Sequence, residues 1–339
     1  MSRRSIADRV DVACLGEALI DLVSVKAGVG LDGAPAFAKA AGGAPANVAV
    51  GVARLGRRAA FVGAVGADSL GRFLREALQR HGVDVRGLTA IVGRPTALAL
   101  VSLKADGDPD FLFYGDRPAH LGLRLTVPMR AIVGQASILH YGSISFLAEP
   151  SRRATLAAIR EARGAGGLCS YDPNLRLGLW SDGRTARRWL REGLRHADCV
   201  KVNAEELAFL TGQRDIGRGL RRLTEAGPAL AVATLGPDGC AYRGPSGEGH
   251  VPGFAAKVVD TTGAGDAFVA GLLVGLLGVA RARSRPWPPR SELEAILTLA
   301  NAAAALSTER RGGIPSLPTR RRVTALLRAR GGQLPARRG

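Results

Sequence analysis

Short apolar runs alternate with amphipathic stretches along most of the chain. Apolar runs bounded by glycine, proline or polar residues predict buried strands at 10–15, 59–65, 137–141, 167–171, 199–202 and 229–235. Helical periodicity predicts helices at 48–55, 69–81, 151–163, 185–196, 267–280, 291–306 and 320–330. This alternation of strand and helix is typical of an α/β protein with a mainly parallel central sheet flanked by helices.

Two short alternating segments, 96–103 and 110–114, break this rhythm on either side of a turn. Together with the stretch 22–37 they predict a small β lid beside the main sheet, formed by residues 22–39 and 95–116. We expect a single domain over 10–330. The polar and basic ends, 1–9 and 331–339, are expected to be disordered.

The net charge of +18 raises nucleic acid as a partner. All but five of the 47 basic residues are arginines, and many lie in the amphipathic helices and at the two ends. Because the sequence has neither zinc-finger spacing nor an aromatic platform for RNA, we expect no specific nucleic-acid binding. An arginine-for-lysine bias in composition explains the charge more simply, although the charge would also attract an anionic nucleotide.

The cysteines and the apolar runs indicate in which cellular compartment the protein is expected. The four cysteines are scattered without metal-type spacing, which is typical of reduced, buried thiols. The N-terminus has no apolar signal segment, and the run 267–280 is too short to span a membrane. We expect a cytoplasmic protein that does not bind membranes.

The stretch DTTGAGD, from Asp260 to Asp266, carries the clearest chemistry. A strand is expected to end at 256–260, and a helix to begin at or near Asp266. Between them Gly263, Ala264 and Gly265 allow a tight turn whose free N–H groups point at one spot, which suits a phosphate. Asp266 at its rim could take the proton of an attacking alcohol. The alternative is a plain helix with Asp266 as its N-cap.

Other polar residues fall where ligands bind in open α/β sheets. Asp21 follows the first strand, and its alternative role is to cap a turn. Gly42 and Gly43 would let the backbone approach a small ligand, and Asn47, in the first turn of the next helix, could bind sugar hydroxyls. Arg176 belongs to a polar cluster after the strand 167–171.

Two further stretches have two readings each. Asn203 and Glu206 share one helical turn, where they suit Mg²⁺ bound through water or form a capping box. The glycine-rich turn after Thr234, with Gly236 and Gly239, could border a nucleotide or be an ordinary hairpin turn.

The segments GGAPAN (42–47) and DTTGAGD (260–266) together resemble the two signatures of the PfkB, or ribokinase-like, sugar kinases. The resemblance runs from about residue 12 to 318, and GEALIDL, DPNLRLGLW and VVDTTGAGDAF are most similar to fructokinases. It implies a three-layer α/β/α fold with a β lid over the sugar. It also implies that Asp266 is the catalytic base and that 263–265 form the anion hole.

The resemblance implies roles for further residues. The sugar site would comprise Asp21, Gly42, Gly43 and Asn47. The nucleotide site would comprise Thr234, Gly236, Gly239 and Asn301, with Asn203, Gly265 and Glu206 near the phosphates and Mg²⁺. A loop for a monovalent cation, K⁺, would comprise Asp260, Thr262, Ser307, Arg310, Gly312 and Ser316. One departure is the segment 116–120, which is unlike the fructokinase pattern Arg-x-x-x-Ala-Asp and puts the identity of the sugar in question.

We therefore expect an ATP-dependent kinase that phosphorylates a primary hydroxyl of a small sugar, with fructose favoured. Arg176 would reach the phosphates or the sugar. Alternatives within the family are 2-keto-3-deoxygluconate kinase, ribokinase and nucleoside kinase. A non-catalytic sugar- or nucleotide-binding regulator is the alternative of another class. A homodimer through the lid strands is compatible with the family.

Overall fold

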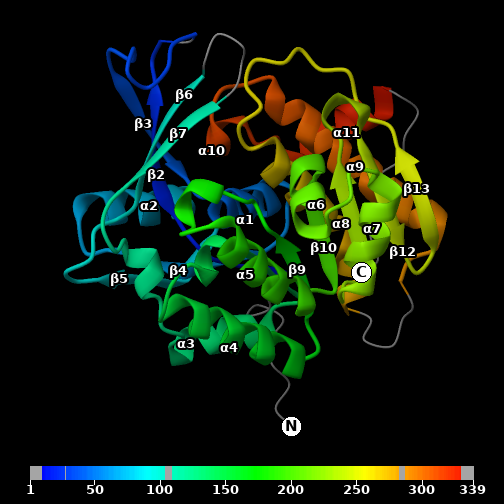
Figure 1. Cartoon of the computed structure of the whole chain (residues 1–339), viewed down its shortest axis with the longest axis horizontal. Coiled ribbons are helices and arrows are strands. Elements are labelled where there is room, and N and C mark those ends of the chain that lie inside the picture. The colour runs from blue at the N-terminus through cyan, green and yellow to red at the C-terminus, as the bar shows by residue number, and fades with distance from the viewer. Residues whose placement is uncertain (1–9, 27, 104–108, 282–286, 330–339) are drawn as a thin grey trace.

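A nine-stranded sheet forms the centre of the molecule (Figure 1). The computed structural model describes residues 10–26, 28–103, 109–281 and 287–329, so the termini expected to be disordered lie outside it. The strands, in sheet order, are β13 (Gly247–Val251), β12 (Cys240–Gly244), β11 (Leu230–Thr234), β10 (Cys199–Asn203), β9 (Leu168–Asp172), β8 (Ile138–Gly142), β1 (Val12–Leu15), β4 (Ala59–Gly66) and β5 (Asp84–Ile91). The strands from β11 to β5 are parallel, and β12 and β13 add an antiparallel hairpin at one edge.

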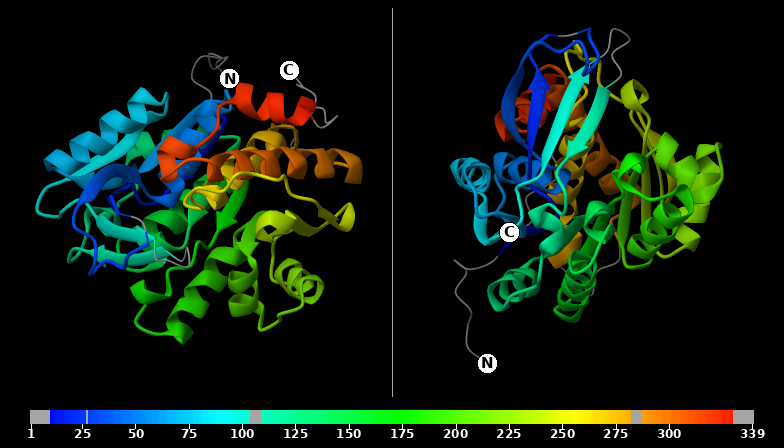
Figure 2. Two further views of the ribbon diagram at one scale, coloured as in Figure 1. Left: turned by 90° about the horizontal axis from the view of Figure 1, so that it is seen from above. Right: turned by 60° about the vertical axis from the view of Figure 1, so that its left-hand side comes forward.

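Helices cover both faces of this sheet, which makes three layers (Figure 2). One layer comprises α1 (Ala44–Arg54), α2 (Ser69–Arg80), α8 (Ala264–Arg281), α9 (Arg290–Thr308), α10 (Gly313–Ser316) and α11 (Arg320–Ala329). The other comprises α3 (Val127–Gln135), α4 (Ser151–Gly164), α5 (Gly183–Arg195), α6 (Ala204–Thr211) and α7 (Ile216–Glu225). Alternate residues of β1 supply the two cores: Val12 and Cys14 face one layer, and Ala13 and Leu15 face the other.

The apolar run behind DTTGAGD is the buried helix α8, and no described helix is long and apolar enough to cross a membrane. Its glycines allow α9 to pack closely. A Cβ on Gly271 would lie 2.8 Å from Ala300 Cα, and one on Gly275 would lie 2.5 Å from Ile296 Cγ2. These contacts are the physical reason for small residues in an otherwise apolar helix.

The expected lid is a separate four-stranded sheet that stands beside the main one. Its order is β3 (Phe37–Gly42), β2 (Leu19–Ser24), β6 (Leu98–Leu103) and β7 (Pro109–Tyr114). β2 and β6 are parallel, and the two outer pairs are antiparallel. β3 leads into α1 with only Gly43 between them, so the lid is joined directly to a helix of the main domain.

Several local expectations were wrong. No strand forms at 256–260, because the N–H groups of Val259 and Asp260 both bond to the Thr308 carbonyl at the end of α9 and not to a neighbouring strand. Asp21 does not follow a strand end but lies within β2. The helix after the Gly-Gly pair begins at Ala44 rather than at 48, with Pro45 in its first turn; Asn47 lies at the start of this helix, as expected. The elements β5, β12, β13, α3, α7 and α10 were not predicted.

Candidate active site

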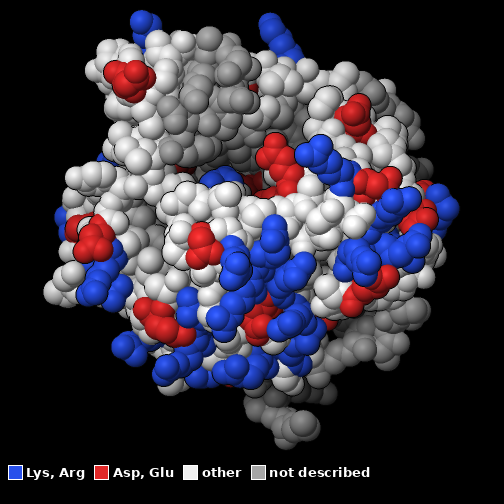
Figure 3. Space-filling model, viewed as in Figure 1, with Lys and Arg blue, Asp and Glu red and all other residues white. Residues whose placement is uncertain are grey.

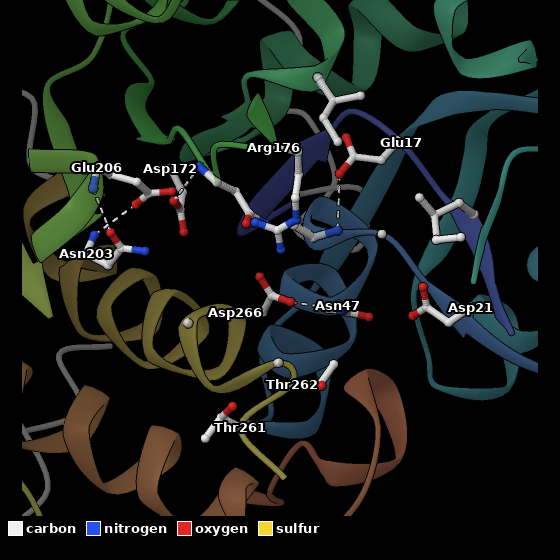
Figure 4. A pocket seen from close by; sticks show the side chains of 18 of the residues that line it. Glu17, Asp21, Asn47, Asp172, Arg176, Asn203, Glu206, Thr261, Thr262 and Asp266 are labelled. Carbon is white, nitrogen blue, oxygen red and sulfur yellow. Dashed lines mark hydrogen bonds between the residues drawn. The ribbon is translucent and has the colours of Figure 1, made fainter. Parts of the chain in front are cut away.

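A cavity of about 400 Å³ lies where the carboxyl ends of the parallel strands meet the lid (Figure 4). Open α/β sheets bind their ligands at this end of the strands. The side chains labelled in the close-up come from the loop between β1 and β2, from β2, α1, β9 and the loop after it, from the end of β10, from α6, and from the loop before α8 and its first turn. Residues 99 and 113, from lid strands β6 and β7, also line it. The cavity therefore joins the lid to both halves of the sheet.

Asp266 lies at the centre of this cavity in the first turn of α8. The helix begins at Ala264, so Asp266 is not its N-cap and that alternative is wrong. Gly263, with φ 82°, makes the turn in front of it. Burial raises the pKa of the Asp266 carboxyl to about 6, against the lowering effect of its hydrogen bond from Asn47. A carboxylate in this state can accept a proton near neutral pH.

Asn47 holds that carboxylate in place. Its Nδ2 donates to Asp266 Oδ2 at 2.8 Å, and its Oδ1 has no partner in the described chain. Gly313 packs against the amide: a Cβ there would lie 2.8 Å from Asn47 Nδ2. Asn47 lines the cavity as expected, but its amide group is bonded to the acid rather than left free for a sugar.

The lid side of the cavity gathers two more carboxyl groups and Arg176. Asp21 projects from β2, and burial raises its pKa to about 7, with Asp266 adding to the rise and Arg176 opposing it. Gly42 leaves the room that the Asp21 carboxylate occupies, since a Cβ there would overlap it. Gly43 lines the cavity with φ 101°, and a Cβ there would lie 2.5 Å from the Glu17 carbonyl oxygen. Both glycines are thus required by close approach.

Glu17 also lines this end and was not singled out from the sequence. Its Oε1 accepts the Ala44 N–H at the start of α1 at 3.2 Å, and its buried Oε2 has no partner in the described chain. Burial raises its pKa to about 7. Its signal in the sequence is an acid inside the otherwise apolar segment CLGEALI.

Lys201, which sequence reasoning missed, forms a second group with Asp172, the first residue of the polar cluster after the strand 167–171. Lys201 Nζ lies 3.1 Å from Asp172 Oδ2, and both side chains are buried. Burial acts to lower the pKa of Lys201, but Asp172 and Glu206 outweigh it and raise the pKa, so the ammonium stays charged. A Cβ on Gly265 would lie 2.9 Å from Lys201 Nζ. The glycine therefore leaves room for a buried cation beside the turn.

The nucleotide residues divide into two groups. Asn203, Glu206, Thr234 and Gly236 line the cavity, whereas Gly239 and Asn301 do not. Gly239 (φ 93°) shapes the turn before β12, and Asn301 Nδ2 donates to the carbonyls of Val251 and Pro252, both at 3.1 Å. Asn301 therefore supports the loop and does not face the cavity.

Asn203 and Glu206 form the capping box that was the alternative reading. Asn203 Oδ1 accepts the Glu206 N–H, and Glu206 Oε2 accepts the Asn203 N–H, both at 2.8 Å. Glu206 Oε1 accepts the Leu175 N–H at 2.7 Å. The same two residues therefore cap α6 and line the cavity.

The expected cation loop is held together by Asp260. Its Oδ1 accepts the Thr262 N–H at 2.8 Å and its Oδ2 accepts the Gly312 N–H at 2.7 Å, which ties the turn before α8 to the loop after α9. The Ser307 and Ser316 hydroxyls instead donate to carbonyls of their own helical turns, and Arg310 is exposed.

The atypical segment 116–120 lies outside the cavity. Its last residue, His120, is buried in a short 3-10 turn, where burial lowers its pKa to about 4. Among the described residues, the lid contributes Leu19 and Asp21 of β2, Ala99 of β6 and Phe113 of β7 to the cavity.

The comparisons with known proteins agree with this geometry. Residues 9–320 match the model of the pfkB family carbohydrate kinases. The chain belongs to this family. Fructokinase-1 of Zea mays is 45% identical over 325 residues, which cover 95% of this chain and 98% of the maize protein. The expected ribokinase-like fold and sugar-kinase activity are thereby confirmed.

Two solved structures of fructokinases resemble the chain over almost its whole length. The Xylella fastidiosa fructokinase with bound ATP is 33% identical, with a TM-score of 0.84, covering 95% of this chain and 99% of that one. The Vibrio cholerae fructokinase, in a form that binds fructose, ADP and calcium, is 34% identical, with a TM-score of 0.81, covering 94% and 99%. As a PfkB kinase, this chain is a phosphotransferase that uses an alcohol group as acceptor.

Proposed function

We propose that this kinase transfers the γ-phosphate of ATP to a primary hydroxyl of fructose. The observation that carries the proposal is the position of Asp266. It lies one residue beyond the Gly263–Gly265 turn, is bonded to Asn47, and faces a cavity closed on one side by the lid. A base beside an anion-binding turn is the arrangement that phosphoryl transfer to an alcohol needs.

In this mechanism Asp266 accepts the proton of the attacking hydroxyl as the oxygen bonds to the γ-phosphorus and ADP leaves. The N–H groups of the turn, together with the positive end of α8, stabilise the negative charge on the transferring phosphoryl group. The Lys201 ammonium, which the space at Gly265 admits, adds a fixed positive charge at the same place. Asp21, the Gly42–Gly43 backbone and Arg176 would hold the sugar under the lid; of these, Asp21, Gly43 and Arg176 line the cavity, and Gly42 leaves room for the Asp21 carboxylate.

The metal ions are assigned from the donors available. Within the described ranges no three or more His, Cys, Asp or Glu side chains are grouped to hold a metal. Mg²⁺ would therefore enter on the ATP phosphates, with Glu206 contacting it through water. Carbonyl groups of the two loops joined by Asp260 suit K⁺, which would steady the turn. Bound K⁺ would supply charge compensation beside the phosphates.

Fructose is favoured over the other acceptors by the names of the similar proteins and by the position of the atypical segment 116–120, which does not line the cavity. The test is coupled ADP release with Mg²⁺-ATP and K⁺ on separate fructose, 2-keto-3-deoxygluconate, ribose, adenosine and glucose. We expect turnover on fructose to exceed that on the other four. A higher kcat/KM on another acceptor would keep the kinase mechanism and reject fructose.

Two further assignments concern the cell and the assembly. All four cysteines are free and buried, which suits the reducing cytoplasm. The lid has two outer strands, β3 and β7, and Leu112 and Tyr114 of β7 are 52% and 67% exposed. Because open strand edges favour pairing, we assign a homodimer through the lids. Sedimentation equilibrium would reject it by giving the monomer mass at micromolar concentration.

A further inference from the structure

Much of the arginine excess lies on one surface away from the kinase site. Helices α4 and α5, 14 and 13 residues long, carry nine arginines against two glutamates, a surplus of seven out of the net +18. Figure 3 shows Lys and Arg side chains gathered over the face where these helices lie. We call this set the arginine face: Arg152, Arg153, Arg160, Arg163, Arg184, Arg187, Arg188, Arg191 and Arg195. A uniform bias in composition does not by itself produce such concentration.

Most of this charge is not neutralised by neighbouring acids. Three ion pairs occur, Arg152 with Glu149, Arg163 with Asp198, and Arg195 with Glu192. Within the described ranges, the other six arginines have no carboxylate at ion-pair distance. Two of them are held by neutral carbonyls: Arg187 Nε donates to Phe209 O at 3.0 Å and Arg191 Nη2 to Leu210 O at 3.0 Å. Their guanidinium groups are thus fixed while their charge remains available.

The spacing of the arginines on α5 suits a ligand that carries phosphate groups at regular intervals. Arg184, Arg188, Arg191 and Arg195 follow one another at spacings of four, three and four, so they form one stripe along α5. At 1.5 Å per residue the stripe is about 16 Å long. Neither helix contains a lysine, and arginine is the side chain whose planar fork matches phosphate oxygens.

Two observations limit the kinds of molecule that the arginine face can bind. None of the exposed large hydrophobic residues lies on α4 or α5, so the face has no apolar anchor for a bilayer. Trp189, the one aromatic residue of the two helices, is covered by the Arg152 guanidinium at 3.7 Å from its ring centroid. No aromatic ring of the face is therefore open for a base to stack on, and recognition would rest on phosphates alone.

We propose that the arginine face binds the phosphate backbone of a single-stranded nucleic acid without regard to sequence. This binding is independent of sugar phosphorylation, and because it needs no recognition of bases it agrees with our expectation of no specific nucleic-acid binding. Sequence-independent binding of this kind has dissociation constants on the order of 10⁻⁴–10⁻⁶ M at physiological salt and weakens steeply as salt rises.

The test is fluorescence anisotropy of a labelled oligo(U) strand with the full chain over a range of salt concentrations. The face variant is Arg153→Gln/Arg160→Gln/Arg184→Gln, because these three exposed side chains form no hydrogen bond or ion pair within the described chain. Each lost phosphate contact should make the salt slope shallower by about 0.7. We expect the slope to fall by about 2 and the affinity by about tenfold or more, with sugar-kinase activity unchanged.

The matched control is Arg72→Gln/Arg80→Gln/Arg328→Gln, which removes the same charge from exposed positions on α2 and α11. It should lower the affinity by less than about threefold, because long-range attraction is screened by salt. Equal losses in the two variants, or no binding to oligo(U) at low salt, would overturn the proposal. Tighter binding to phosphatidylserine vesicles than to oligo(U) would reassign the face to a membrane and likewise overturn it.

Discussion

Asp266 combines burial, a bond from Asn47 and a place beside the anion-binding turn, so its removal should affect catalysis more than folding. Asp266→Asn leaves an amide oxygen that can still accept from Asn47 but no group to take the proton. We expect kcat to fall by roughly 10²–10⁴ with the melting temperature almost unchanged. Coupled ADP release and thermal melting measure the two effects.

The control for this substitution is Glu76→Gln, which makes the same acid-to-amide change at an exposed site on α2. It should leave both quantities unchanged. A normal kcat in Asp266→Asn, with the chain folded, would remove Asp266 from the role of base.

Glu17 gives a prediction about stability and pH. Burial raises its pKa in the folded chain from 4.5 to about 7. Between these values the folded state keeps a proton that the unfolded state has released, so the contribution of Glu17 to stability is lost as the pH rises through this window. Glu17→Gln has no carboxyl to ionise, so it does not lose this stability as the pH rises. Its melting temperature relative to the unsubstituted chain should therefore rise from pH 5 to pH 8, by roughly a few degrees.

Differential scanning calorimetry at the two pH values checks this. Glu76→Gln serves again as the control. The difference between its melting temperature and that of the unsubstituted chain should be the same at pH 5 and pH 8. A Glu17→Gln difference that stays constant with pH would mean that the Glu17 carboxyl ionises normally in the folded chain.

The residues found from the sequence were those in contiguous motifs. Gly263, Gly265 and Asp266 lie in one heptapeptide, and Asn203 and Glu206 lie in one helical turn, so local spacing was enough. Lys201 could not be found in this way. Its place beside Gly265 depends on β10 delivering it across more than sixty residues of chain, and its charge depends on Asp172 from the neighbouring strand.

At the scale of the element, a substitution in the first turn of α8 should change activity and stability in opposite directions. Gly265→Ala should improve helix propensity by up to about 1 kcal/mol. Its Cβ would lie 2.9 Å from Lys201 Nζ and would force the ammonium out of place. We expect kcat/KM for ATP to fall by about tenfold or more while the melting temperature holds or rises.

Gly278→Ala is the matched control in the same helix, because a Cβ there meets nothing within 4 Å. It should retain full activity. If Gly265→Ala also retained full activity, the space beside Lys201 would have no catalytic importance.

Element boundaries were the weaker part of the sequence prediction, and the reasons are local. The segment 256–260 has the Val-Val pair of a strand, but its N–H groups bond to the end of α9. α7 was missed because Gly217 and Gly219 lower its helix propensity, although Leu220 and Leu223 bury its apolar side. β5 was missed because it is a mixed segment with Gly87 inside it.

At the scale of the whole molecule, the strand–helix alternation was sufficient to predict a parallel sheet between two helix layers, and the break in that rhythm predicted the lid. The order of the strands was not predictable from the pattern, because it depends on pairings between segments far apart in sequence. β1, for example, lies between β8 and β4.

The cavity formed by this assembly should give a characteristic pH profile. Burial raises the pKa of Asp266 to about 6 and that of Asp21 to about 7. Because Asp266 must be ionised to accept a proton, kcat/KM should fall as the pH drops below about 6. Initial rates at limiting fructose and saturating ATP, from pH 5 to 9, measure this limb. A flat profile down to pH 5 would contradict it.

The Asp260 carboxylate, which accepts from Thr262 on one side and Gly312 on the other, makes two distant segments into one thermodynamic unit. A ligand that reduces local opening of the turn before α8 should therefore also reduce local opening of the loop after α9. ATP should therefore slow amide deuterium uptake at 310–316, although those residues lie outside the cavity, and Asp260→Ala should abolish this slowing. Deuterium uptake in this loop would thus report nucleotide occupancy in a molecule that is not turning over.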